Sequence, residues 1–238
     1  MWIYDLFSIF NGRIEKKGKL IVIEGTDGSG KSTQFRLLTH RLAKENIPFE
    51  KLVFPQYEEP SSALIRMYLG GEFGTHPEDV NAYTASTFFA VDRFASYKKV
   101  WGRWYEQGGL VVSDRYTTSN AVHQASKEPP EKQREFLKWL YELEYDHMGL
   151  PRPDLVLYLD VPTAFTETLL RSREAATGTH ADIHEADTAY LAASRRMGRI
   201  AADFYGWKVI SCVAEGKMRS MEDIHEEIYR YVKALLED

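Results

Sequence analysis

Residues 23–33, with the sequence IEGTDGSGKST, combine closely spaced glycines with a lysine and hydroxyl side chains. Glycines let successive backbone N–H groups turn inward around an anion, and a helix that follows adds further free N–H groups. Lys31 would supply a positive charge for the outer phosphates, and Ser32 would supply a hydroxyl group for Mg²⁺. The spacing therefore predicts a site for a nucleoside triphosphate together with Mg²⁺.

The complete pattern Gly25-x4-Gly30-Lys31-Ser32 is that of the P-loop, and its sequence context fits. An apolar run typical of a buried strand precedes it, and apolar side chains at helical spacing follow it. A glycine-rich turn that holds no phosphate is the weaker alternative, because it would not need this context. The residues expected to bind ATP are Gly25, Thr26, Asp27, Gly28, Ser29, Gly30, Lys31, Ser32 and Thr33.

The elements that must position this loop alternate between strands and helices along the chain. Strands are expected over residues 19–24, 49–54, 110–113, 154–160 and 207–212. Helices are expected over residues 31–45, 61–69, 77–107, 131–147, 163–175, 185–205 and 220–236. Such alternation predicts an α/β fold, in which a five-stranded parallel sheet is flanked by helices on both faces. No linker, repeat or low-complexity stretch divides the chain, so residues 19–238 are expected to form a single domain.

The composition is that of an ordinary globular protein. The chain has 238 residues, of which 44% are hydrophobic and 27% charged, and its net charge is −5. The negative charge argues against nucleic acid as a partner, and no apolar run is long enough to cross a membrane. The single cysteine, Cys212, excludes an intrachain disulfide and fits the cytoplasm. Residues 1–18 place an apolar part before a basic part, the reverse of a secretory signal, and are expected to be an extension of unknown role.

The remaining sequence narrows the class of P-loop protein. A GTPase should carry an Asn-Lys-x-Asp motif and a motor ATPase a strand that ends in Asp-Glu, and neither is found. A small kinase fits better, because it needs extra arginines to hold a second anionic substrate beside the first. Arg93 follows FFAVD on a predicted helix. Arg115 follows Asp114 at the carboxyl end of the third strand, where α/β sheets bind ligands.

In these arginines and in further segments, the sequence resembles the thymidylate kinase family of nucleoside-monophosphate kinases. The matching segments are, in order, GTDGSGKST, FPQY, FFAVDR, SDRYTTSNAVHQ, RPDLVLYLDVP, ADIHE and YGWKVI. The resemblance implies a P-loop kinase fold with a short lid over about residues 172–186. It also implies transfer of the γ-phosphoryl group of ATP to dTMP with Mg²⁺, and a homodimer to which the aromatic helix around residues 87–104 could contribute.

The resemblance assigns the reacting region to a few charged side chains. Arg115 would grip the dTMP phosphate, since a planar guanidinium suits a bidentate grip. A surface ion pair between Arg115 and Asp114 is the simpler alternative. Asp27 would lie near the sugar 3′-hydroxyl and the phosphate of the monophosphate. Asp114 and Ser32 would hold Mg²⁺, and Lys31 would act on the phosphates of ATP.

The resemblance also implies which residues contact the base and the sugar of the monophosphate. Phe89 would stack on thymine, Arg93 would hydrogen-bond one edge of the base and Asn120 the opposite edge. Pro55 resembles a proline that often follows a cis bond, and Tyr57 could close over the monophosphate. Core packing for Phe89 and surface exposure for Tyr57 remain open as alternatives. The expected substrate-binding residues are Asp27, Pro55, Tyr57, Phe89, Arg93, Arg115, Ser119, Asn120, His123 and Gln124.

Three features depart from the family pattern. His123 stands where relatives usually carry a tyrosine near the sugar, and Gln56 where an arginine or an acidic residue is commoner. The P-loop carries no arginine, and residues 174–194 contain neither lysine nor arginine. We therefore expect Arg171 and Arg173 to supply the catalytic cations from the edge of the lid.

Two other functions remain possible from the sequence. A deoxynucleoside kinase, or a kinase of another monophosphate, could use the same fold, but a deoxynucleoside kinase often carries Glu-Arg-Ser where this chain has Asp114-Arg115-Tyr116. A nucleotide-binding module without turnover could explain the poorly charged lid.

Overall fold

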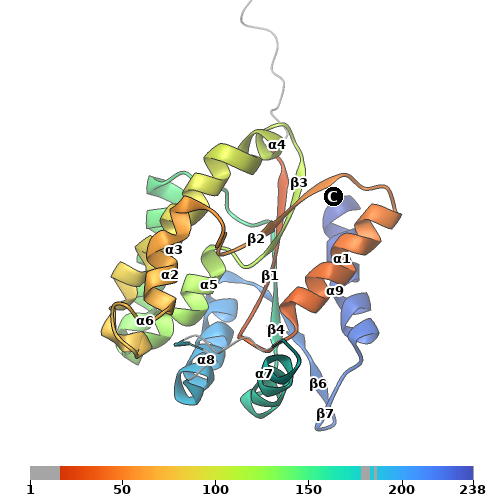
Figure 1. The fold of residues 1–238 in the computed structure, drawn as a ribbon. Coiled ribbons are helices and arrows are strands. Elements are labelled where there is room, and N and C mark those ends of the chain that lie inside the picture. The colour runs from red at the N-terminus through yellow and green to blue at the C-terminus, as the bar shows by residue number, and fades with distance from the viewer. Residues whose placement is uncertain (1–16, 178–182, 185–186, 238) are drawn as a thin grey trace, which may run out of the picture.

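The computed structural model describes residues 17–177, 183–184 and 187–237 (Figure 1). Five parallel strands form one sheet in the order β2-β3-β1-β4-β5, which confirms the predicted sheet. The strands are β1 (Lys19–Gly25), β2 (Phe49–Val53), β3 (Leu110–Asp114), β4 (Leu155–Asp160) and β5 (Lys208–Ser211). A short antiparallel pair that the sequence did not predict, β6 (Val213–Ala214) with β7 (Lys217–Met218), follows β5.

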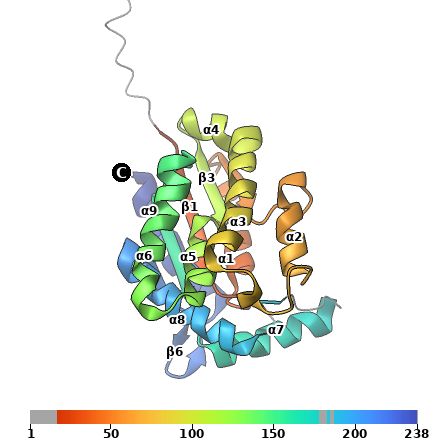
Figure 2. The ribbon, with the colours of Figure 1, turned by 90° about the vertical axis from the view of Figure 1, so that its left-hand side faces the viewer.

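Helices cover both faces of the sheet, as expected (Figure 1). α1 (Lys31–Lys44) and α9 (Met221–Glu237) lie side by side over one face. On the other face are α3 (Ala82–Ser96), α4 (Gly102–Glu106), α5 (Thr117–His123), α6 (Pro130–Tyr141) and α8 (Thr188–Tyr205). Figure 2 shows α2 (Ala63–Leu69) beside α3, and α7 (Thr163–Thr177) lies at the end of the sheet to which β1 runs.

The long helix expected over residues 77–107 is interrupted, and the one expected over 131–147 ends in a π-helical turn. The first begins as a separate 3-10 turn, after which Asn81 caps α3 by accepting a hydrogen bond from the Thr84 amide at 2.8 Å. A π-helical turn, Tyr97–Trp101, then separates α3 from α4. A second π-helical turn, Glu142–His147, extends α6. The spacing of apolar residues in the sequence does not reveal either π-helical turn, because such a turn shifts the helical register by a single residue.

The apolar run of β1 is explained by burial on both faces. Leu20 and Val22 contribute to the core under the π-helical turn Tyr97–Trp101 and α4, whereas Ile21 and Ile23 contribute to the core under α1 and α9. Alternate side chains of a strand point to opposite faces, so a central strand needs apolar residues throughout. Pairing of β1 with β3 sets Ile23 opposite Asp114, and this register brings the P-loop next to Arg115. Within the described part of the chain, no helix is long and apolar enough to cross a membrane.

Candidate active site

The P-loop takes the conformation that its glycines permit. Gly30 caps α1 with a φ of 85°, and Gly28 has a φ of 76°, both in the left-handed region that side chains disfavour. A Cβ atom at Gly28 would also lie 2.7 Å from the carbonyl oxygen of Thr166 on α7. The loop therefore needs glycine both for its backbone turn and for the close approach of α7.

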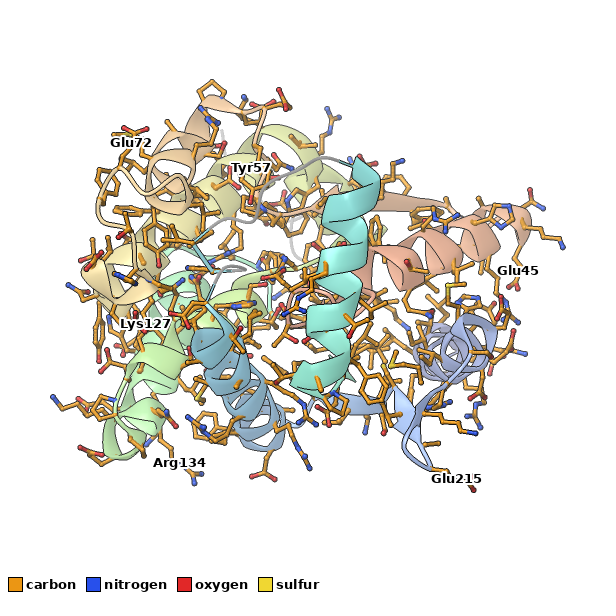
Figure 3. The ribbon with its side chains drawn as sticks, turned by 60° about the horizontal axis from the view of Figure 1, so that its bottom comes forward. Glu45, Tyr57, Glu72, Lys127, Arg134 and Glu215 are labelled. Carbon is orange, nitrogen blue, oxygen red and sulfur yellow. The ribbon has the colours of Figure 1, made fainter. Side chains whose placement is uncertain are left out.

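A cavity of about 530 Å³ opens at this end of the sheet, which Figure 3 views directly. It lies between the P-loop, the carboxyl end of β3, α3, α5 and α7. The predicted site residues that line it are Asp27, Gly28, Gly30, Lys31, Ser32, Thr33, Pro55, Tyr57, Phe89, Arg93, Asp114, Arg115, Ser119, Asn120, His123 and Gln124. Gly25, Thr26 and Ser29 belong to the P-loop without lining the cavity.

Arg115 faces the P-loop rather than Asp114. Its backbone φ is 68°, an uncommon value for a residue other than glycine, and its Nη2 donates to Asp27 Oδ1. Lys31 Nζ lies 3.7 Å from the same Asp27 oxygen and donates to the Thr26 carbonyl at 2.8 Å. Burial alone would raise the pKa of Asp27, but the charges of Arg115 and Lys31 outweigh it and hold that pKa well below its ordinary value. Asp27 is therefore a carboxylate between two cations.

Glu24 lies behind Arg115 and belongs to none of the sequence motifs. This fully buried carboxylate accepts hydrogen bonds from Thr118 Oγ1 at 2.6 Å and Ser119 Oγ at 2.7 Å. Its Oε1 lies 3.9 Å from Arg115 Nη1. The sequence does contain one sign of this role, an acidic residue immediately before the P-loop glycine. Burial of a charge is costly without a partner, so an acidic residue in an otherwise apolar strand indicates a specific contact.

Ser32 and Asp114 form the pair expected to hold Mg²⁺. Ser32 Oγ donates to Asp114 Oδ2 at 3.0 Å, while the buried Asp114 Oδ1 has no hydrogen-bond partner among the described residues. A hydroxyl oxygen and a free carboxylate oxygen at the edge of the phosphate site are the ligand types that Mg²⁺ prefers. No cluster of three or more His, Cys, Asp or Glu side chains that could hold a metal occurs in the described ranges.

The proposed base readers Arg93 and Asn120 share a partner that the sequence did not reveal. Arg93 is 2% exposed and makes a two-point contact with Glu144, by Nε at 2.6 Å and by Nη2 at 2.5 Å. Burial opposes the charge of Arg93, but the carboxylate of Glu144 raises its pKa above the ordinary value. Asn120 Nδ2 donates to Ser86 O at 3.1 Å and to Glu144 Oε1 at 3.3 Å. Glu144 lies in the π-helical turn after α6, far from any motif.

Pro55, Tyr57 and Phe89 belong to the apolar part of the cavity wall. The Phe54–Pro55 bond is cis, and Tyr57 is 46% exposed at the cavity (Figure 3). Buried Asp92 holds this segment by accepting hydrogen bonds from the Gln56 amide at 2.9 Å and Ser61 Oγ at 2.6 Å. Phe89 lines the cavity and also packs on Tyr68, whereas its stacking on a base stays a prediction.

Two histidines meet at the side of the cavity nearest the lid. His184 is 6% exposed and lies parallel to His123 at a centroid distance of 5.9 Å. His184 Nε2 is 2.9 Å from Tyr68 Oη, to which Lys127 Nζ donates at 2.7 Å. His123 Nε2 accepts from Arg115 Nη1 at 3.2 Å, while its Nδ1 has no described partner. A hydrogen bond from a guanidinium requires that this nitrogen carry no proton.

Acidification is expected to destabilise the protein through His184. Burial, with the charge of Lys127, lowers the pKa of His184 from 6.5 to about 3. As the pH falls, His184 is therefore protonated in the unfolded chain before it is protonated in the folded protein. The contribution of neutral His184 to the free energy of unfolding is complete above pH 6.5 and is lost as the pH falls toward 3. We expect the free energy of unfolding, measured with urea, to fall between about pH 7.5 and about pH 5.5. This fall should be about 1.4 kcal/mol larger in the wild type than in His184→Gln. His147→Gln, at an exposed site, is the matched control, and equal losses in all three proteins would contradict the expectation.

The lid is the least described part of the site. Residues 178–182 and 185–186 of the expected lid, and the side chain of Arg173, lie outside the described residues. Arg171 lies on α7, is exposed and does not line the cavity, to which α7 contributes Leu169. The catalytic role expected for Arg171 and Arg173 therefore remains a prediction.

The fold and the cavity together define a P-loop protein of the α/β class, in which the guanidinium of Arg115 faces the phosphate loop. The family model described as Thymidylate kinase matches residues 23–228. The chain therefore belongs to the thymidylate kinase family, and the resemblance seen in the sequence is confirmed.

Individual relatives agree with this assignment. The chain is 32% identical to the thymidylate kinase of Mycobacterium tuberculosis over 157 residues, which are 65% of this chain and 71% of that protein. It is 28% identical over 221 residues to a probable thymidylate kinase of Pyrococcus horikoshii, covering 91% and 97% of the two chains. The fold matches the structure of thymidylate kinase from Candida albicans with a TM-score of 0.67, at 20% identity and 92% coverage of both chains.

Proposed function

We propose that the protein transfers the γ-phosphoryl group of ATP to dTMP, giving dTDP and ADP. The observation that carries the proposal is that Arg115 and the P-loop line one cavity, where Asp27 contacts both Arg115 and Lys31. Phosphoryl transfer needs positioning and neutralisation of charge more than covalent chemistry by the protein. Cations on both sides of a cavity supply that neutralisation for two facing nucleotides.

On the donor side, the N–H groups of the P-loop and the charge of Lys31 would hold the phosphates of ATP. Ser32 and Asp114 would hold Mg²⁺, which when bound neutralises phosphate charge and polarises the transferred group. Arg171 and Arg173 would approach the same phosphates from the lid.

On the acceptor side, Arg115 would exchange its contact with Asp27 for the phosphate of dTMP. An arginine already fixed by two carboxylates loses little conformational freedom when it binds a phosphate. The base would enter between Phe89 and the polar pair Arg93 and Asn120. The other residues proposed to contact the acceptor are Pro55, Tyr57, Ser119, His123 and Gln124.

A coupled ADP-release assay with a panel of acceptors tests this proposal. The panel is dTMP, dUMP, dCMP, dGMP and thymidine at equal concentrations, with ATP and Mg²⁺. We expect the highest kcat/KM for dTMP and no turnover of thymidine, because a nucleoside lacks the phosphate that Arg115 would grip. Equal rates with all the monophosphates would reject the assignment of dTMP.

We further propose a cytoplasmic homodimer built from residues 19–238, with residues 1–18 as an extension. Leu64 on α2 and Val91 on α3 are each more than two-fifths exposed, and the two helices lie side by side (Figure 2). Light scattering should then give twice the 27.4 kDa mass of the chain, and Val91→Glu should halve it. A monomeric wild type would contradict the dimer.

A further inference from the structure

Glu144 is a fully buried carboxylate to which the proposed reaction gives no role, yet it contacts two residues of the cavity wall. It is 0% exposed, in the π-helical turn Glu142–His147. Its Oε1 accepts from Arg93 Nη2 and from Asn120 Nδ2, and its Oε2 accepts from Arg93 Nε and from Thr117 Oγ1 at 2.8 Å. A buried carboxylate is costly unless donors surround it, and four described donors converge on this one.

These contacts fix the direction of the Asn120 amide. Nδ2 carries two hydrogens, and its two recorded acceptors are Ser86 O and Glu144 Oε1. A flipped amide would place Oδ1 against a carbonyl oxygen and a carboxylate oxygen, so both hydrogen bonds would be replaced by contacts between two acceptors. The amide atom that remains for a ligand in the cavity is therefore Oδ1, which is an acceptor.

The same carboxylate fixes Arg93. Its Nε and one Nη2 hydrogen point to Glu144, and Nη1 lies 3.4 Å from Tyr116 O. A guanidinium has five N–H donors, so further hydrogens remain on Nη1 and Nη2. The cavity wall thus offers donors from Arg93 and an acceptor from Asn120.

We propose that Glu144 is a positioning residue that sets this order of donor and acceptor, and thereby makes the protein prefer a 4-oxo pyrimidine over a 4-amino pyrimidine. The inference rests on the proposed function, because it concerns the base of the monophosphate acceptor. A 4-oxo pyrimidine presents the O4 acceptor beside the N3–H donor and complements the wall. A 4-amino pyrimidine presents the opposite order and would bring donors against donors.

The variant Glu144→Gln tests the proposal, with Glu142→Gln as a matched control. Both lie on the same turn, but Glu142 is 63% exposed. An amide cannot accept from Arg93 and Asn120 as a carboxylate does. In Glu144→Gln, the ratio of kcat/KM for dTMP to that for dCMP should fall roughly tenfold or more. The ratio of dTMP to dUMP, which share the 4-oxo edge, and the KM for ATP should not change. If kcat/KM fell by the same factor for dTMP, dUMP and dCMP, Glu144 would be merely structural, and the proposal would be overturned.

Two further arms keep the test decisive. If Glu144→Gln does not fold, Glu144→Asp is measured in the same way, with the same expected fall in the ratio. In the wild type, N3-methyl-dTMP lacks the N3–H donor and should compete with dTMP at least roughly tenfold more weakly than dUMP does. Equal competition would overturn the assigned direction of Asn120. Absence of any dTMP turnover by the wild type would instead reject the proposed function, so the two failures are distinguishable.

Discussion

Replacing Arg115 by alanine is expected to lower kcat/KM for dTMP by roughly two orders of magnitude or more. Asp27 and Glu24 both orient Arg115, which lines the cavity. Burial would lower the pKa of Arg115, but the two carboxylates raise it above the ordinary value, so the side chain keeps its charge. Without it, the phosphate of the acceptor would enter the cavity next to Asp27 with only Lys31 to offset the repulsion between the two negative charges. Steady-state kinetics with varied dTMP measure the loss.

Two controls separate this role from a general effect of the arginine. Arg103→Ala removes an exposed arginine on α4 and should leave kcat/KM within roughly twofold. Arg115→Lys keeps a charge but not the planar fork, and it should recover only part of the activity. A loss below tenfold in Arg115→Ala would mean that Arg115 does not grip the phosphate.

Replacing Lys31 by methionine is expected to reduce kcat by roughly 10²–10³, the usual cost of removing one fixed cation or donor at a developing charge. Methionine fills similar volume, so the 6% exposed position stays packed while the charge is lost. Burial and the neighbouring Arg115 lower the pKa of Lys31, whereas Asp27 raises it. The affinity for dTMP, measured by calorimetry without ATP, should change much less than kcat does.

Lys44→Met is the matched control for this prediction. Lys44 is the last residue of the same helix, α1, and is exposed. Its replacement should leave both kcat and the dTMP affinity unchanged. If Lys31→Met kept more than a tenth of the wild-type kcat, the P-loop lysine would not act on the transferred phosphate.

The sequence was sufficient wherever local chemistry determines the structure. The P-loop was predictable because its glycines, lysine and serine have consecutive roles in one turn. The parallel sheet was predictable because Leu20 to Ile23 are apolar on both faces of the strand. Most bounds of strands and helices agree to within a few residues.

The parts that could not be predicted depend on contacts between distant segments. Glu144 reaches Arg93 across 51 positions of sequence, and Asp92 reaches Gln56 across 36. A lone carboxylate on a predicted helix gives no sign of such a partner. His184 offered only a polar loop as context, and its burial depends on Tyr68 and His123. The supporting contacts of the site were therefore missed, whereas the residues of the motifs were found.

The most direct test of the central claim compares dTMP with thymidine as acceptor and identifies the products. Purified wild-type protein is incubated with ATP, Mg²⁺ and either compound, and the nucleotides are separated by chromatography. We expect dTDP and ADP to form in equal amounts from dTMP, while thymidine is left unchanged. Formation of dTMP from thymidine, or ATP binding with no transfer to dTMP, would contradict it.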